Sequence, residues 1–338
     1  MTKTPADTEA PSEVSYREAM REAIAAQWAA VWKAIPAVID SDDPDAVHRV
    51  RVASRRLRAA MDVAPACFPP KWYRPLHKTS KAITRSLGEV RDRDVLLDAL
   101  TREREQASAA ERPGIDHMIA GVRRERKRER KKMLRFLLTL ESEKIPKETK
   151  RRFSRSKDRK RGKGKAKTDV AGKDQTPRDS RETILSLDPE ASLATNARRV
   201  LAVRVNELFA YTPIIPDAIE TELLHDARIA TKRLRYTLEL FPGVFGDEGA
   251  HAITQLQALQ EELGHLHDHD VRIERIEEEA ARLGEQPATA ELRASLLGLL
   301  DREQGVRATQ HGAVVACWQA MEREGLQESL VALTAPVD

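Results

Sequence analysis

The stretch HRVRVASRRLR at residues 48–58 returns 177 residues later as HDARIATKRLR at residues 225–235. Six of the eleven positions are identical, and three of the others are conservative replacements. A second pair of blocks, LGEVRDRDV at 87–95 and LGHLHDHDV at 263–271, is offset by 176 residues and has five of nine positions identical. Two separate blocks at nearly one offset indicate that the chain contains an internal duplication.

Both halves of the chain have the apolar spacing of amphipathic helices, with breaks between the periodic stretches. The pattern predicts helices over about 16–39, 44–64, 74–106 and 113–142, and again over about 189–211, 217–241, 248–283 and 288–324. No alternating strand pattern is evident, and aromatic residues make up only 4% of the sequence. The expected fold class is all-α, with two four-helix bundles related by a pseudo-twofold. Trp28 and Trp32, one turn apart, could stack on a ligand, but we expect them to pack in the core.

Positive charge is concentrated between the two halves. The whole chain has 58 Lys and Arg against 54 Asp and Glu, whereas residues 144–181 alone have 16 against five, which leaves 42 against 49 elsewhere. This segment has few large apolar residues, so we expect a disordered basic linker over 144–182. The expected organisation is a disordered tail at 1–14, a first repeat at 15–143 and a second repeat at 183–335.

Each copy of the first block places one histidine and three cations along one face of its helix. At 100° per residue these side chains fall within an arc of about 80°, opposite an apolar face. The two stripes are His48, Arg51, Arg55 and Arg58 in the first half, and His225, Arg228, Lys232 and Arg235 in the second. Like charges on one face repel each other, so the stripes favour an anionic ligand. The alternative is a solvent-exposed face that acidic partners on neighbouring helices neutralise.

The predicted third helix of the first half carries further cations that the second half lacks. The first-half set is Arg74, Lys78, Lys81 and Arg85, and the residues 176 positions later are Ala250, Thr254, Gln257 and Glu261. If the halves share a ligand, the first half is therefore expected to hold it more strongly.

The second block contains Asp-x-Asp elements, at 92–94 and 268–270, that could suggest a metal-dependent phosphohydrolase. Residues two apart on a helix point about 200° apart, so we expect these carboxylates to orient arginines or cap helices. His265, His267 and His269 resemble zinc ligands, but the first copy has no histidines at these positions, and no metal site is predicted.

The remaining features favour a non-catalytic protein without a cofactor. No nucleophile–histidine–carboxylate set, P-loop or carboxylate cluster is evident. The two cysteines, Cys67 and Cys317, fit neither a disulfide framework nor a metal site and suggest a reducing compartment. No apolar stretch is long enough for a membrane helix, so a soluble, cytoplasmic protein without membrane partners is expected.

The paired H-x-x-R-x-x-x-[RK]-R-L-R blocks, each followed by L-G-x-x-x-D-x-D-V, resemble the CHAD family, the conserved histidine α-helical domain. The resemblance covers about residues 15–330 apart from the basic linker. It implies two four-helix bundles that enclose a basic surface or pore for inorganic polyphosphate. The binding residues implied by position are His48, Arg51, Arg55, Arg56, Arg58, Lys81, Arg85 and Arg91, together with His225, Arg228, Lys232, Arg233 and Arg235.

The chemistry of these residues suits a chain of phosphates. Arginine can grip two phosphate oxygens at once, lysine adds point charge, and binding through many such contacts falls steeply with salt. The expected function is non-catalytic polyphosphate binding, with association with polyphosphate granules as a further expectation. Two alternatives are binding of nucleic acid or other polyanions through the basic linker, and an accessory role in metal-dependent phosphate hydrolysis.

Overall fold

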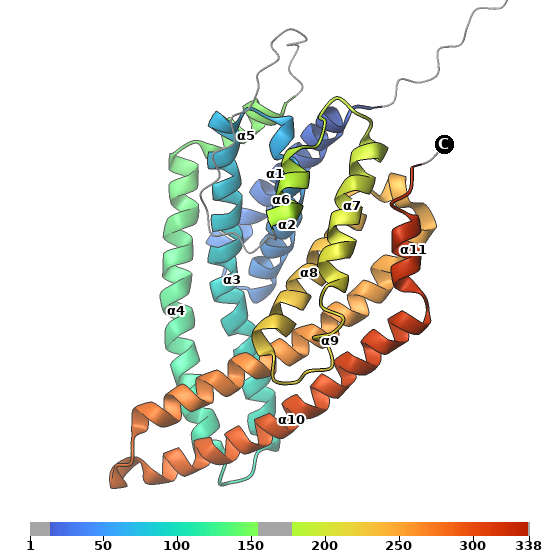
Figure 1. The fold of residues 1–338 in the computed structure, drawn as a ribbon. Helices are drawn as coiled ribbons and strands as arrows, with labels where there is room; N and C mark the ends of the chain where they lie inside the picture. The colour runs from blue at the N-terminus through green and yellow to red at the C-terminus, as the bar shows by residue number, and fades with distance from the viewer. Residues whose placement is uncertain (1–13, 155–177, 337–338) are drawn as a thin grey trace, which may run out of the picture.

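The computed structural model describes residues 14–154 and 178–336, and these contain helices and no β-strand (Figure 1). The long helices are α1 (Tyr16–Asp40), α2 (Pro44–Val63), α3 (Pro70–Gln106) and α4 (Arg112–Ser142), then α7 (Leu193–Phe209), α8 (Thr221–Leu240), α9 (Pro242–Leu283) and α10 (Ala290–Arg323). The short ones are α5 (Ile145–Phe153), α6 (Arg178–Leu185) and α11 (Leu326–Ala332). The all-α fold class is confirmed, and each predicted helix corresponds to a long helix of the structure. The expected tail lies outside the described residues apart from Val14.

The starts of α1 and α7 lie side by side and pair with each other in antiparallel directions. Ser15 and Ser192, which are 177 residues apart, cap the two helices with their side chains and form an isolated antiparallel bridge. Backbone hydrogen bonds of 2.9 Å and 3.3 Å join the two segments in opposite directions. The bridge therefore pairs positions that the 177-residue offset of the sequence repeat makes equivalent.

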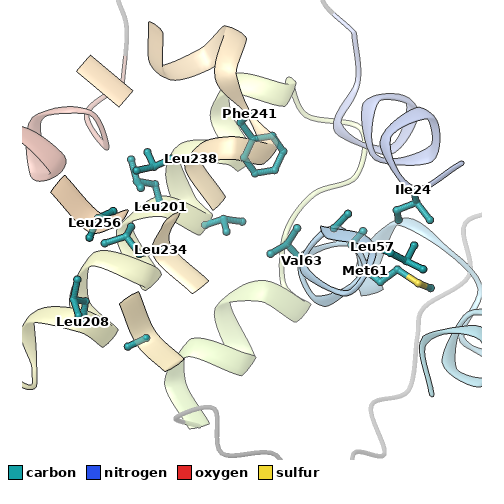
Figure 2. Packing of buried hydrophobic residues seen from close by; sticks show 14 of the residues in the cluster. Ile24, Leu57, Met61, Val63, Leu201, Leu208, Leu234, Leu238, Phe241 and Leu256 are labelled. Atoms are coloured by element: carbon teal, nitrogen blue, oxygen red, sulfur yellow. The ribbon is translucent and has the colours of Figure 1, made fainter. Parts of the chain in front are cut away.

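One apolar core runs through both halves and fixes α2 and α8 at the centre of the molecule. Leu57 and Met61 of α2 and Leu234 and Leu238 of α8 belong to one continuous cluster of buried side chains (Figure 2). The two helices also contact each other directly. Because their apolar faces are used by this core, the basic faces of α2 and α8 remain outside it.

The two tryptophans of α1 belong to this core, as expected. Their rings are stacked with centroids 5.2 Å apart, and Trp28 is only 2% exposed. Trp32 donates a hydrogen bond of 2.9 Å from Nε1 to the Thr149 hydroxyl of α5.

A second, smaller apolar cluster joins the far ends of two helical hairpins. Leu100 and Ile119 of the α3–α4 hairpin pack with Ile276 and Leu299 of the α9–α10 hairpin. Figure 1 shows the long helices α9 and α10 crossing the lower ends of α3 and α4. The halves are therefore joined at two places, at the central core and at these tips.

Close approach of α4 and α10 at the tips depends on Gly114. Its amide donates to the Ser295 hydroxyl at 2.9 Å, and that hydroxyl donates to the Glu111 carbonyl at 3.1 Å. A Cβ at Gly114 would lie 2.9 Å from the Ser295 oxygen and 3.3 Å from the Leu296 backbone nitrogen. A larger residue would therefore require the Ser295 hydroxyl and the neighbouring α10 backbone to move.

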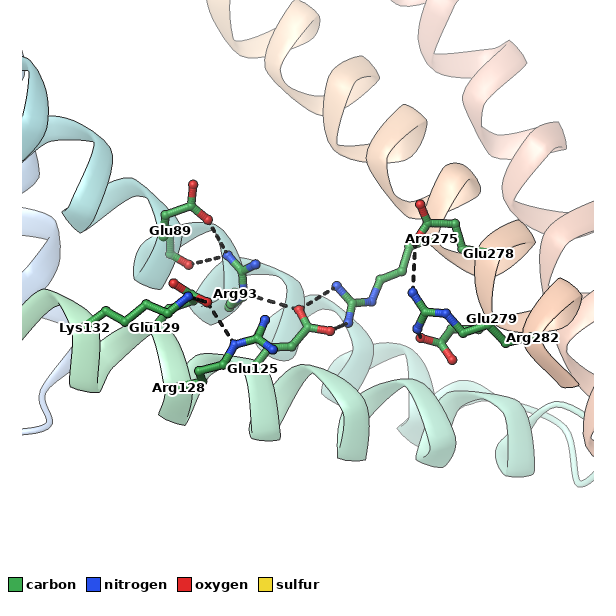
Figure 3. Close-up of polar contacts among 10 residues, drawn as sticks. All are labelled: Glu89, Arg93, Glu125, Arg128, Glu129, Lys132, Arg275, Glu278, Glu279 and Arg282. Atoms are coloured by element: carbon green, nitrogen blue, oxygen red, sulfur yellow. Dashed lines mark hydrogen bonds and ion pairs between the residues drawn. The ribbon is translucent and has the colours of Figure 1, made fainter.

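Ion pairs extend the tip contact along α4 (Figure 3). Glu125 of α4 accepts from Arg275 of α9 and pairs with Arg93 of α3 at 3.3 Å. Nearer the tips, Arg302 of α10 pairs with Glu103 of α3. One half supplies the carboxylate and the other the guanidinium in the Glu125–Arg275 and Glu103–Arg302 pairs, so these contacts hold the halves together.

The prediction of a disordered linker over 144–182 is wrong at both of its ends, which are helical. Residues 145–153 form α5, in which Thr149 is 1% and Phe153 is 2% exposed. Phe153 packs against the rings of Phe68 and Trp72, with centroids 5.3 Å away in both cases. These few apolar contacts order a segment whose composition is otherwise that of a linker. Residues 155–177 lie outside the described residues, and α6 begins at Arg178.

Candidate functional site

Four cations from α2 and α8 lie together where the two halves meet, and we call them the central cation cluster: Arg51, Arg55, Arg228 and Lys232. Burial, then repulsion by the three arginines, lowers the pKa of Lys232 from 10.5 to about 6. Burial and repulsion by Arg55 also lower the pKa values of Arg51 and Arg228. Each half supplies two members, so the cluster exists only when both halves are in place.

The cluster has few carboxylates to neutralise it. Arg51 donates to Asp92 of α3 at 3.0 Å, and Asp268 of α9 lies near enough to Arg228 to oppose the fall of the arginine's pKa. Within the described residues, neither Arg55 nor Lys232 has a salt-bridge partner. The cluster therefore has an excess of positive charge. The alternative of a face neutralised by acidic neighbours applies to only part of it.

A glycine places the first arginine of each stripe against the neighbouring helix. A Cβ at Gly88 of α3 would lie 2.4 Å from Nη1 of Arg51, so the guanidinium occupies the space that a side chain would take. The equivalent Gly264 of α9 lies beneath Arg228, with a hypothetical Cβ 3.8 Å from its Nε. That Nε is buried and has no hydrogen-bond partner among the described residues. Sequence analysis did not assign these glycines a role, although the Leu-Gly pair is identical in both copies.

The second aspartate of each Asp-x-Asp element holds an arginine of the fourth long helix. Asp94 of α3 accepts from Arg126 of α4, which also pairs with Asp42 in the turn before α2 at 3.1 Å. In the other half Asp270 of α9 accepts from Arg307 of α10 at 2.5 Å, and this arginine also donates to a carbonyl in the loop before α8. These contacts confirm the prediction that the carboxylates orient arginines. They also fix the start of each helix that carries a basic stripe.

The two stripe histidines lie beside different partners. His48 is exposed near Arg91, and partial burial together with Arg91 lowers its pKa. His225 occupies the equivalent place, and its Nδ1 lies 3.1 Å from Nδ1 of His267, the residue that replaces Arg91. Burial and the charge of Arg228 lower the pKa of His267 to about 3, so this ring is neutral at physiological pH.

The three histidines of the second block point to different neighbours. His267 contacts His225, His269 lies 2.6 Å from Glu303 of α10, and His265 is exposed. In the described part of the chain, no three potential ligands converge on one point.

The last cation of each stripe is occupied by a carboxylate one turn further on. Arg58 lies 3.4 Å from Asp62, which also lies 3.7 Å from Lys81 of α3. In the second half Arg235 pairs with Glu239 in the same i, i+4 relation. These predicted site residues therefore form ion pairs at the end of the stripe, away from the excess charge of the central cation cluster.

Three further predicted site residues are Arg56, Arg85 and Arg233. Arg56 and Arg85 are exposed, and Arg233 is half-buried near Tyr211. The third-helix face of the second half, residues 250–261, bears no cation, as the sequence indicates, and Thr254 and Gln257 on it are exposed.

The fold and the site define an all-α, internally duplicated protein with a cation-rich site where its halves meet. The family model described as the CHAD domain matches residues 22–277. The chain belongs to the CHAD domain family.

Two solved structures share the fold. The crystal structure of the CHAD domain from the plant Ricinus communis is 24% identical, with a TM-score of 0.65 over 94% of this chain and 98% of that one. PptA from Streptomyces chartreusis is 16% identical, with a TM-score of 0.55 over 92% of this chain and 99% of that one. A search of curated proteins gives no match. None of the described helices is long and apolar enough to cross a bilayer.

Proposed function

We propose that the chain binds inorganic polyphosphate at the central cation cluster and catalyses no reaction there. The observation that carries the proposal is the convergence of Arg51, Arg55, Arg228 and Lys232 from both halves, with Arg55 and Lys232 lacking a carboxylate partner in the described residues. Cations kept this close are stable only at the cost of mutual repulsion, which a bound polyanion relieves. Membership of the CHAD family supports the same ligand.

The half-buried position of the cluster favours a slender, flexible polyanion. The four side chains are half-buried, and they come from α2 and α8, which contact each other. Inorganic polyphosphate has no bases or sugars to exclude, and the guanidinium groups can each bind two of its oxygens. Exposed cations such as Arg56 and Arg85 can contact the parts of a long chain that leave the cluster.

The roles of the carboxylates support a binding protein rather than a phosphohydrolase. Asp92, Asp94 and Asp270 each hold an arginine, and their positions in the helices keep them from facing one common point. On this account the accessory role in metal-dependent hydrolysis is the weaker proposal. Association with polyphosphate granules would follow from the affinity itself.

A competition titration with the full chain tests the proposal. Labelled long-chain polyphosphate is bound at near-physiological salt and challenged with heparin, duplex DNA and short phosphates. Retention of the label against heparin and DNA supports a dedicated site, and equal displacement by every polyanion refutes it. When the protein is incubated with polyphosphate and magnesium or manganese, no phosphate should be released from the polyphosphate.

The proposed alternative, binding of nucleic acid through the basic linker, concerns residues 155–177, which lie outside the described residues. A chain that lacks these residues separates the two proposals. Loss of polyphosphate binding on their removal would place the function in the linker.

A further inference from the structure

The run RRERKRERKK on α4 takes no part in the central cation cluster, yet it leaves a second row of cations on the outside of the molecule. Arg123, Lys127, Lys131 and Arg135 follow one another at every fourth position, and all four are exposed. Side chains four apart form one row along a helix, and twelve residues extend it over about 18 Å. We call these four residues the outer row.

The outer row has no partners within the described part of the chain. None of its side chains forms a hydrogen bond or salt bridge there. The two carboxylates of this stretch are used elsewhere: Glu125 faces Arg93 and Arg275, and Glu129 pairs with Arg128 and Lys132 (Figure 3). Four positive charges are therefore left without compensation on one face.

The fold itself does not require these charges, because the symmetric helix α10 lacks them. Arg126 of α4 and Arg307 of α10 hold equivalent aspartates, which sets the offset between the two helices at 181 residues. At this offset the outer row corresponds to Gln304, Ala308, Gly312 and Ala316, which are also exposed and carry no charge. One half thus has an uncompensated cationic row where the other half has a neutral one.

We propose that the outer row is a docking surface for the phosphate backbone of duplex nucleic acid. Lysine and arginine bind such backbones without reading sequence, and no exposed aromatic side chain in the row is available to stack on bases. A rigid, straight ligand can lie along an exposed row on one helix, whereas the half-buried central cation cluster suits a flexible chain. The surface is distinct from the polyphosphate site and does not depend on it.

The neighbouring charges favour this partner over an anionic membrane. The exposed residues of α9 near its contact with α4 include Glu274, Glu277 and Glu278. A broad, flat anionic surface that extended from α4 onto α9 would also meet these carboxylates. A rod that lies along α4 needs no contact with α9. The one large apolar side chain exposed on α4 is Leu138, which is little for insertion into lipid.

The test compares two variants of the full chain with equal net charge. The first carries Lys127→Gln, Lys131→Gln and Arg135→Gln, and the control carries Lys33→Gln, Arg199→Gln and Arg323→Gln on three other helices. Binding of a labelled duplex DNA without sequence preference is measured over a range of salt concentrations. Both proteins retain the basic linker, so it contributes equally to both.

The outer-row variant should bind duplex about tenfold more weakly than the control at near-physiological salt. The slope of log affinity against log salt should become shallower by about 2 to 3, one phosphate contact per cation removed. Its affinity for long-chain polyphosphate should be unchanged.

Equal duplex affinity and equal slope in the two variants would overturn the proposal. So would a loss confined to polyphosphate, which would make the row part of the first site, or a loss confined to vesicles that contain phosphatidylglycerol. Failure of the unmodified chain to bind polyphosphate would refute the proposed function. The duplex-binding comparison of the two variants would still test the outer row by itself.

Discussion

Gly88 lets one guanidinium lie where a side chain would otherwise be, and this gives a sharp test at the residue scale. Gly88→Ala places a methyl group 2.4 Å from the present position of Arg51 Nη1, so the guanidinium that donates to Asp92 must move. We expect polyphosphate affinity to fall about tenfold, which corresponds to the loss of one charge-assisted contact. The fold should persist, because the displaced atom ends a flexible side chain.

The matched substitution is Gly264→Ala in the second half. Its methyl group would lie at an ordinary 3.8 Å from Arg228 Nε, so its effect on binding should be much smaller. Alanine should raise helix stability by up to about 1 kcal/mol. Titrations of both variants with labelled polyphosphate decide the matter, and equal losses in affinity would show that the glycines do not position the arginines.

The low pKa of Lys232 predicts that the protein takes up a proton when it binds polyphosphate. The folded-state pKa is about 6, below the usual 10.5, so the Lys232 amine is mostly neutral in the ligand-free protein at about pH 8. A bound polyanion favours the charged form and raises this pKa. Affinity should therefore decline as pH rises above about 6. Without ligand, the unfolded chain binds the extra proton between pH 6 and 10.5, so this residue makes the free protein more stable as pH rises.

Calorimetry in two buffers of different ionisation enthalpy measures the proton uptake. Lys232→Met should reduce the uptake near pH 8, by up to about one proton per cluster. His225 and His267 remain in both proteins, so the difference belongs to the lysine. Equal uptake in the two proteins would contradict the assignment of the low pKa to Lys232.

Residue types and spacing predict which residues make up most of this site, but not all of the ion pairs that they form. The repeat and the helical period place Arg51, Arg55, Arg228 and Lys232 on two matching faces. The i, i+4 spacing of Arg58 and Asp62 is compatible with their pairing, but the further contact of Asp62 with Lys81 depends on how α3 packs against α2.

At the scale of elements, the contact between α4 and α10 at the hairpin tips can be tested through Gly114. Gly114→Ala would press a methyl group against the backbone of α10 at Leu296. We expect the free energy of unfolding to fall by about 1–3 kcal/mol, since Ser295 and the α10 backbone must shift to accept the methyl group. Gly298→Ala, on α10 with no atom within 4 Å of its Cβ, should instead stabilise the protein by up to about 1 kcal/mol. Urea unfolding of both variants provides the comparison, and an unchanged Gly114→Ala protein would argue against tight packing here.

The helices themselves could be predicted from the sequence, because apolar periodicity and breaks mark them clearly. The helix α5 could not, because its two large apolar residues, Ile145 and Phe153, lie in a segment dominated by charge. Phe153 is buried because its ring packs against the rings of Phe68 and Trp72. This packing brings together residues more than eighty positions apart in the sequence, which local patterns do not reveal.

At the scale of the whole molecule, the contact between α2 and α8 makes the proposed binding site a shared property of the two halves. Sequence repeats predict two similar bundles, but separate bundles would leave two separate basic stripes. The continuous core through α2 and α8 is what brings the stripes together. The long tips of α9 and α10 add a second junction that the helix lengths alone did not indicate.

The most direct test of this account compares long-chain polyphosphate binding by three double variants of the full chain. One carries Arg51→Gln and Arg55→Gln, another carries Arg228→Gln and Lys232→Gln, and the control loses two charges elsewhere, by Lys33→Gln and Arg199→Gln. A site built by both halves predicts a loss of at least about tenfold in each of the first two variants, with a shallower salt dependence, and little change in the control. Equal affinity in all three, or a loss confined to one half, would contradict the shared central site.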